Sequence, residues 1–255
     1  RFKKWPWTIL EVPPLSVASS LRWAQLRLGF FRANPFMAWV ESEFGHLPKS
    51  PAIFQLMLDA YDEAEGPPQN FKLTELFEEG VKRLLQRVAR TLEMRRIAVK
   101  VRMMRTLIIL ETVAVVCHLR ETDHFTDADV KACRTLDTGQ HEGWATISLL
   151  AQTGRAALIA GVPASRSHPA GYCFVHPMFH HFLVSRVITR RLLHPDREDP
   201  ATLMLPSVEQ LFRIASRPWW SGTVEFLAVT KELENFPSIA SYLHQSRCPP
   251  LVVAA

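Results

Sequence analysis

Three histidines stand within six residues in the segment 173–183, whose sequence is CFVHPMFHHFL. His176 and His180 are four residues apart, a spacing that places two imidazoles on one face of a helix, as in many zinc sites. Histidine also transfers protons, and at the start of a helix it can help to bind an anion. The segment therefore raises three hypotheses: a metal site, an acid–base centre and an anion site.

Pro177 weighs against the metal hypothesis. Proline is best tolerated in the first turn of a helix, so we predict that His176 is the N-cap residue with non-helical backbone angles. Its side chain then does not project in parallel with that of His180. The segment also lacks the glutamate of the H-E-x-x-H zinc motif. We therefore predict no metal-binding residue.

An acid–base role requires a nucleophile or a paired carboxylate near the histidines. The chain contains no G-x-S-x-G motif, and the segment has no cluster of Asp or Glu. We predict no catalytic residue. For His180 and His181 we expect a role in covering a surface or in packing. For His176 two interpretations remain, a simple helix cap or a phosphate contact supported by free backbone N–H groups and the helix dipole.

Composition sets the size of the structure that can form. The chain has 255 residues, of which 47% are hydrophobic and 22% charged, enough to bury a core in one large domain or two to three small ones. The net charge is +5, a mild basic bias compatible with a surface that contacts polyanions. The chain has four cysteines and no C-x-x-C pair, so we interpret them as reduced thiols and expect a cytoplasmic protein.

The longest apolar run, 107–119, is interrupted by Glu111 and falls short of the roughly 20 residues that cross a bilayer. We interpret it as a buried helix and expect no membrane partner. Residues 7–12 have the alternation of a short strand, but the chain hardly supplies a partner for it. We therefore expect the sequence to be a piece of a longer protein.

Local signals predict helices in the first part of the chain. One helix is predicted over 16–31. Asn34 and Pro35 have the types of an N-cap and a first-turn residue, and they predict a second helix that ends at Gly45. The pair at 50–51, Ser-Pro, repeats the same start signal.

A long amphipathic helix is predicted over 73–92, where leucines and other apolar residues recur on one stripe. Its remaining face and its continuation are basic. The residues concerned are Lys82, Arg83, Arg87, Arg90, Arg95, Arg96, Lys100, Arg102 and Arg105. Such a run is usually a solvated helix face, and a nucleic-acid contact surface is the alternative.

The centre of the chain predicts a small mixed module. Thr126 and Asp129 form a capping box that begins a short helix after the buried one. The stretches 156–160 and 172–175 predict a β-hairpin with a long tip, followed at once by the helix from Pro177. This order resembles a winged-helix domain. Apolar positions at 211–214, 224–227 and 233–243 predict further helices.

Residues 174–185, FVHPMFHHFLVS, closely resemble the F-x-H-x-x-F-x-E-F-L-A-A segment that closes the winged-helix domain of NACHT-type STAND NTPases. Two departures are His181, which replaces an acidic residue, and Val184-Ser185, which replaces Ala-Ala. Other segments follow in the order of the family. LEVPPLS at 10–16 resembles the exit from the last strand of the NTPase core, and ANPF at 33–36 resembles the opening of the small helical domain. LPKS at 47–50 resembles the start of the next helix of that domain, and FTDADV at 125–130 resembles a winged-helix motif.

The resemblance implies an ATP/ADP switch in a signalling protein of the immune or defence type, with Mg²⁺ as the metal of the nucleotide and self-association of the full-length protein on activation. It implies that Pro35 packs on the adenine and that His176 reaches the β-phosphate of ADP and holds the winged helix closed. Arg1 would be the remnant of the sensor strand end T-S-R. The phosphate-binding G-x-x-x-x-G-K-[ST] loop and the Walker B acid are absent from this sequence, so the chain alone is expected neither to bind ATP tightly nor to hydrolyse it.

The predicted fold is mainly α, a helical domain followed by a winged-helix domain with a small β-hairpin, as a fragment of a larger α/β P-loop NTPase. The predicted division is 1–29 for the end of the NTPase core, 30–100 for the small helical domain, 101–194 for the winged helix and 195–255 for the start of a further helical region. The alternative function is a winged-helix protein that binds nucleic acid through the basic face from Arg83 to Arg105.

Overall fold

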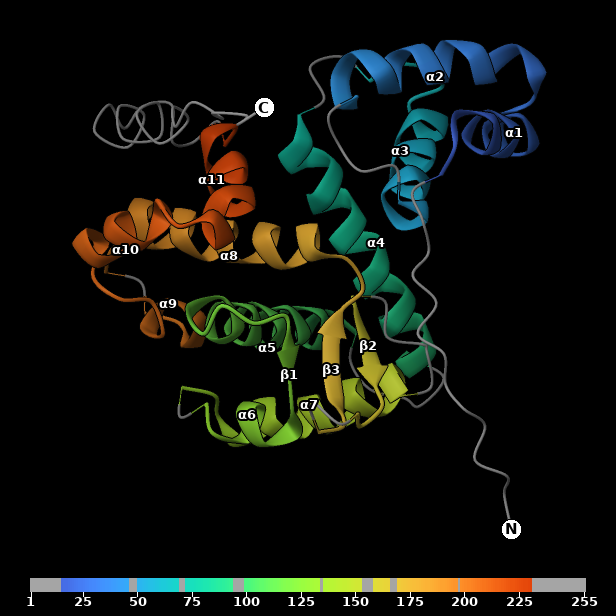
Figure 1. Ribbon diagram of the computed structural model, residues 1–255. Coiled ribbons are helices and arrows are strands. Elements are labelled where there is room, and N and C mark those ends of the chain that lie inside the picture. Colours follow the sequence, from blue (N-terminus) through green and yellow to red (C-terminus); the bar gives the residue numbers. More distant parts are fainter. Residues whose placement is uncertain are drawn as a thin grey trace. The chain divides into compact units, whose positions relative to one another are not determined.

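The computed structural model is mainly helical and has one small antiparallel sheet (Figure 1). It describes residues 15–45, 50–68, 72–93, 99–133, 135–152, 158–165, 169–196 and 198–230. The chain forms two compact units, residues 1–76 and 77–255. Within the described residues, no helix combines the length and the apolar character needed to cross a membrane. The mainly helical fold class predicted from the sequence is confirmed, while the four-part division stays a prediction.

The first unit contains helices α1 (Val17–Leu28), α2 (Phe30–Phe44) and α3 (Pro51–Glu63). Ser16 caps α1 by accepting the backbone N–H of Ser19 at 3.1 Å, and Ser50 caps α3 by accepting that of Ile53 at 3.4 Å. Both hydroxyls satisfy a donor that the first turn of a helix leaves free. The start predicted at residues 50–51 and the end predicted at Gly45 are confirmed.

The boundary between α1 and α2 differs from the prediction. A helix over 16–31 and a second start at Asn34 are both wrong, because the chain breaks at Gly29 and α2 already begins at Phe30. Gly29 has φ of 82°, a backbone conformation that favours glycine. Pro35 therefore lies inside α2 rather than in its first turn. Asn-Pro resembles a start signal, but the left-handed glycine decides where the helix breaks.

Aromatic rings fill the core of the first unit. The ring of Phe36 lies 5.5 Å from that of Phe54 and 5.2 Å from that of Tyr61, both in edge-to-face geometry. Trp39 packs against Tyr61 from the next turn of α2, at 5.7 Å. These large apolar rings dominate the burial that holds the three helices together.

The second unit follows helix α4 (Leu73–Glu93), in which the boundary between the units falls. Its elements are α5 (Val99–Leu119), β1 (His124–Phe125), α6 (Asp127–Lys131), α7 (Thr138–Gln152), β2 (Ile159–Val162), β3 (Gly171–Phe174), α8 (Pro177–Leu193), α9 (Pro200–Leu203), α10 (Val208–Ala215), the short 3₁₀ helix η1 (Pro218–Trp220) and α11 (Ser221–Ala228). The predicted capping box of Thr126 and Asp129 is confirmed at the start of α6.

The sheet has the strand order β1-β3-β2, and both pairs of neighbours are antiparallel. Cys173 of β3 faces His124 on one side and Ala160 on the other. The predicted hairpin is confirmed, although its first strand covers 159–162 rather than 156–160. Since α8 begins three residues after β3 ends, the hairpin fixes where that helix starts (Figure 1).

Helices α5 and α8 lie side by side at the centre of the second unit, and α7, α9 and α11 pack on this pair (Figure 1). A cluster of phenylalanines joins α4, α8 and α11. The ring of Phe77 lies 5.2 Å from Phe179, 5.7 Å from Phe182 and 5.0 Å from Phe226. The helices predicted at 211–214 and 224–227 are present as α10 and α11, whereas 233–243 lies outside the described residues.

A buried ion network crosses the contact between α5 and α8. Glu111, only 1% exposed, accepts hydrogen bonds from Arg186 at 3.1 Å and from Arg190 at 2.8 Å. Arg190 also binds Asp199, the N-cap residue of α9, at 2.6 Å. Burial alone would lower the pKa of Arg190, but Glu111 and Asp199 outweigh it and raise that pKa. The network satisfies a carboxylate that would otherwise be costly to bury.

We expect Glu111→Gln to lower the free energy of unfolding by about 3 kcal/mol, because Arg186 and Arg190 then lose their shared buried carboxylate and keep only Glu78 and Asp199 as charged partners. Urea denaturation followed by circular dichroism measures this change. The matched control is Glu121→Gln, which removes the partner of the exposed Arg217 and should cost less than about 1 kcal/mol. Equal costs for the two variants would contradict the role assigned to Glu111.

Candidate functional site

His176 is the N-cap residue of α8, as the sequence predicts. Its backbone is extended, with φ of −153° and ψ of 137°, and Pro177 is the first residue of the helix. The ring nitrogen Nδ1 of His176 accepts the backbone N–H of Met178 at 3.2 Å. The imidazole is thus held at the helix entrance by its own backbone and does not share a face with His180.

The cap fixes which nitrogen of His176 can donate. Because Nδ1 accepts a hydrogen bond, a neutral ring carries its proton on Nε2. Burial lowers the pKa of His176 below its usual value of 6.5, which favours this neutral form at pH 7. His176 therefore offers one N–H donor at the helix entrance.

The backbone donors of this helix end are already used. Pro177 has no N–H, Met178 donates to the ring of His176, and the N–H of Phe179 donates to the carbonyl oxygen of His176 at 3.1 Å. The prediction of free backbone N–H groups is wrong for these residues, because the histidine cap satisfies them. An anion at this end would rely on the Nε2–H group and the helix dipole.

His180 is a core residue. Only 1% of it is exposed, and its Nε2 donates to the carbonyl oxygen of Ala114 in α5 at 2.8 Å. Its ring stacks on Phe174, with centroids 5.1 Å apart and planes 5° apart. The predicted packing role is confirmed, and the alternative of a surface role is wrong because α5 and β3 enclose the ring.

His181 belongs to a hydrogen-bonded chain that the sequence does not reveal. Its Nδ1 lies 3.1 Å from the hydroxyl of Thr223 in α11, which lies 3.1 Å from Nε2 of His118 at the end of α5. The indole N–H of Trp219 donates to Nδ1 of His118 at 3.1 Å. His118 and Thr223 are fully buried.

Burial and the neighbouring rings hold these histidines neutral. Burial, with His180 and His181 nearby, lowers the pKa of His118 to about 2. Burial, with His180 and His176 nearby, lowers the pKa of His181 to about 4. Neutral rings around a hydroxyl that is itself fully buried, that of Thr223, fit packing rather than proton transfer to a substrate. His118 ends an apolar run, and a polar residue in that position is a weak hint of a buried partner.

The other predicted site residues lie elsewhere. Pro35 is an exposed residue of α2 in the first unit, whereas His176 belongs to the second unit. Arg1 lies outside the described residues.

The basic face is described only at its ends. The described side chains are those of Lys82, which pairs with Glu79 at 3.2 Å, and of Arg105, which is exposed. The others, Arg83, Arg87, Arg90, Arg95, Arg96, Lys100 and Arg102, lie outside the described side chains. Helix α7, the second helix after the buried α5, contains no Lys or Arg.

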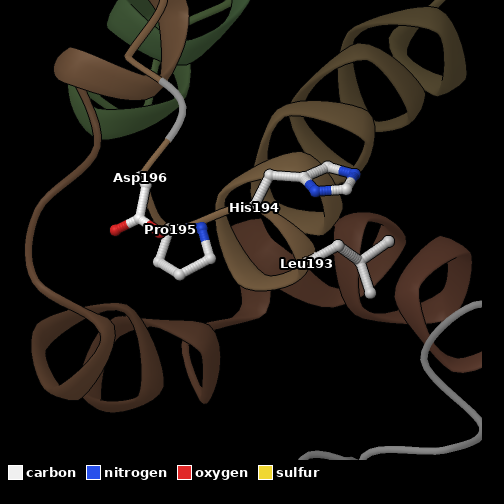
Figure 2. A pocket seen from close by; sticks show the side chains of 4 residues that line it. All are labelled: Leu193, His194, Pro195 and Asp196. Atoms are coloured by element: carbon white, nitrogen blue, oxygen red, sulfur yellow. The ribbon is translucent and has the colours of Figure 1, made fainter.

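A hollow of about 400 Å³ lies at the far end of α8, lined by Leu193, His194, Pro195 and Asp196 (Figure 2). In Figure 2 the carboxylate of Asp196 and the ring of His194 point in different directions, so they do not converge on one ligand atom. Since α8 has 17 residues, this hollow is roughly 25 Å from His176 along the helix.

Among the described residues, no group of three or more His, Cys, Asp or Glu side chains is arranged to hold a metal ion. Cys117, Cys133 and Cys173 are free thiols, and burial raises the pKa of Cys117 to about 12. A thiol with such a pKa is protonated and unreactive at pH 7.

A comparison with known proteins gives no match to any family model or to any curated protein.

We expect the free energy of unfolding to fall as the pH decreases from about 6.5 to 4. In this range the unfolded histidines take up protons, whereas folded His118 and, down to about pH 4, His181 do not, so the unfolded state binds more protons. Each histidine contributes up to about 1.4 kcal/mol per pH unit. Urea denaturation at several pH values measures the slope, and ¹⁵N-histidine NMR should show His118 neutral at pH 5.

The control is His194→Gln, at the exposed end of α8, which should leave the slope unchanged. A stability that does not change between pH 6.5 and pH 5 would contradict the neutral state of the buried histidines.

Proposed function

We propose that this chain is the nucleotide-state-sensing part of a STAND signalling NTPase of the NACHT type, a cytoplasmic ATP/ADP switch. The observation that carries the proposal is the position of His176, at the entrance of the helix that follows the hairpin, with its Nε2–H as the available donor. This is the residue to which the resemblance of segment 174–185 assigns the contact with ADP.

The order of elements in the second unit supports a winged-helix module. Helix α5, strand β1, helices α6 and α7, and the hairpin β2–β3 follow one another, with the strand order β1-β3-β2. A short strand before a pair of consecutive helices, joined in one antiparallel sheet to a hairpin after them, is the arrangement expected for such a module. Here α8 follows the hairpin directly and has His176 as its N-cap residue.

The chemistry of His176 suits a phosphate. Phosphate oxygens accept hydrogen bonds and carry negative charge, so a neutral Nε2–H donor at the positive end of a helix dipole is complementary to them. Such a charge-assisted hydrogen bond is worth roughly 1.5–3 kcal/mol. When bound, the nucleotide supplies this negative charge, and its Mg²⁺ and remaining phosphate contacts would come from a P-loop region that this sequence lacks.

Pro35 supports the proposal less directly. Its ring is exposed on α2, so its apolar face is accessible to a flat apolar partner such as an adenine base. For Arg1 the role implied by the resemblance stays a prediction.

An exposed apolar patch on the first unit fits a chain that belongs to a larger protein. Leu26, Phe30 and Phe31 around the break between α1 and α2 are 81%, 69% and 96% exposed. Side chains of this size are normally covered, and neighbouring exposed ones indicate a contact surface. In the proposed protein the remainder of the NTPase, or another copy after activation, would cover them.

Nucleic-acid binding remains the second hypothesis, and no described contact favours it. A helix-turn-helix reads DNA through its second helix, but α7 offers no Lys or Arg for the phosphates. Its test is a titration of duplex DNA and RNA at low salt, where binding with a steep salt dependence would favour it over the nucleotide switch.

In the full-length protein, we expect His176→Asn to accelerate ADP dissociation by at least about tenfold, because the shorter amide can cap α8 through its oxygen but places no donor at the position of Nε2. Stopped-flow release of a fluorescent ADP analogue measures the rate. Basal signalling should rise as the closed state is lost.

Two comparisons sharpen this test. His194→Ala, at the far end of the same helix, should leave ADP dissociation unchanged. An unchanged melting temperature for His176→Asn separates a lost phosphate contact from a lost cap. Unchanged ADP dissociation and unchanged basal signalling in His176→Asn would reject the proposed role, as would a reading frame without a P-loop upstream.

A further inference from the structure

The chain of hydrogen bonds from Trp219 to His181 joins four elements. Trp219 lies in η1 and Thr223 in α11, whereas His118 ends α5 and His181 lies in the second turn of α8. Each of the three links is 3.1 Å long. The last described helix is thus connected through polar contacts to both central helices of its unit.

The direction of this chain is fixed at one end. The indole N–H of Trp219 can only donate, so Nδ1 of His118 accepts and its Nε2 carries the proton. His118 then donates to the hydroxyl of Thr223. The hydroxyl is left to donate its own hydrogen to Nδ1 of His181. Every link is satisfied when both histidines are neutral. A second proton on His118 places its Nδ1–H against the indole N–H of Trp219, and a second proton on His181 makes the Thr223 hydroxyl accept from both rings, so that its own hydrogen loses its acceptor.

Other residues pack tightly around these hydrogen bonds. The ring of Trp220 lies 4.1 Å from that of His118 in edge-to-face geometry. Gly222 packs against the ring of His181 so closely that an added Cβ would lie 2.8 Å from its Cδ2 atom. A side chain at position 222 would therefore push α11 away from α8.

The described titratable groups around these hydrogen bonds are two histidines of α8 and three exposed residues, Asp123, Glu121 and Arg217. His180 faces both rings, at 5.0 Å from His118 and 5.7 Å from His181. His176 acts on His181 from the same helix, and Asp123, just after α5, acts on His180. On the side of η1, Arg217 is paired with Glu121 at 2.6 Å. None of these neighbours supplies a carboxylate in direct contact with His118 or His181 that would stabilise an added proton.

We propose that Trp219, His118, Thr223 and His181 form a neutral latch that holds η1 and α11 against α5 and α8, and that protonation of His118 or His181 releases this segment locally. The release is local because α5, α7 and α8 keep their contacts with one another and with the sheet, whereas α11 is attached chiefly to α8 and η1. The latch does not depend on nucleotide binding. The latch would connect α8, whose N-cap residue is His176, to η1 and α11.

Hydrogen–deuterium exchange followed by mass spectrometry tests the latch. Protection factors, corrected for the intrinsic effect of pH, are measured at pH 7 and pH 5 for peptides covering 218–230 and for peptides covering 109–117 in α5. We expect the protection of 218–230 to fall by roughly 10²–10³-fold, the factor given by two histidines that titrate normally only when released, and to lie at least about tenfold below that of 109–117 at pH 5, because 218–230 opens without unfolding of the whole unit. A protection of 218–230 that does not fall, or that equals the protection of 109–117 at pH 5, would overturn the proposal.

Variants at Thr223 separate the hydroxyl from the packing. At pH 7, Thr223→Val should lower the protection of 218–230 by about tenfold or more, whereas Thr223→Ser, which keeps the hydroxyl, should retain it. Trp219→Phe serves as a milder second variant that removes the donor to His118, and it should move the loss of protection to a higher pH. If Thr223→Val and Thr223→Ser behave alike and Trp219→Phe leaves the pH dependence unchanged, the hydrogen-bonded chain does not act as a latch.

Discussion

The second unit depends on satisfying the polar groups that helix α5 buries. Glu111, Ala114 and His118 lie three or four residues apart, so they follow one face of the helix. Helix α8 supplies their partners in reverse order. Arg186 and Arg190 pair with Glu111, and His180 donates to the carbonyl oxygen of Ala114. His181 is connected to His118 through the hydroxyl of Thr223. The two helices are therefore antiparallel, and their register is set by polar contacts within an otherwise apolar interface. A shift of one turn would leave buried charged and polar groups without partners, which costs more than the loss of apolar contacts alone.

This register also sets the position of the candidate site. His176 is the N-cap residue of α8, two residues after strand β3 ends, and its ring is held by the hydrogen bond that it accepts from the backbone N–H of Met178. One turn later, His180 and His181 anchor the helix to α5 and α11. The three histidines of this segment therefore have different structural roles. One residue offers a donor at the helix entrance, and the other two hold the helix in place as neutral core groups. The proposed sensing role and the proposed latch rest on different residues of the same helix.

Much of the local structure could be predicted because it depends on short-range physics. The caps at Ser50, Thr126 and His176 each arise from a side chain that bonds a backbone group two or three residues away. The amphipathic stripe of α4 and the hairpin are similarly local. The prediction failed at Pro35, since proline is tolerated both in a first turn and, at a cost, within a helix. Only the left-handed backbone at Gly29 decides between these options, and that conformation depends on how α1 and α2 pack.

The sequence by itself determined the mainly helical class, the N-cap position of His176 and the separation of that residue from the helical face of His180. Tertiary structure decided the rest. The burial of His118, its contact with Thr223 over 105 residues of chain, and the pairing of Glu111 with Arg186 and Arg190 depend on which helices meet. No local pattern encodes such contacts, because burial and partner choice arise from the packing of distant segments. The backbone N–H groups of Met178 and Phe179 are a different case, because their partners are atoms of His176 itself, so the prediction that they are free failed on a local contact that leaves the Nε2–H of His176 as the donor.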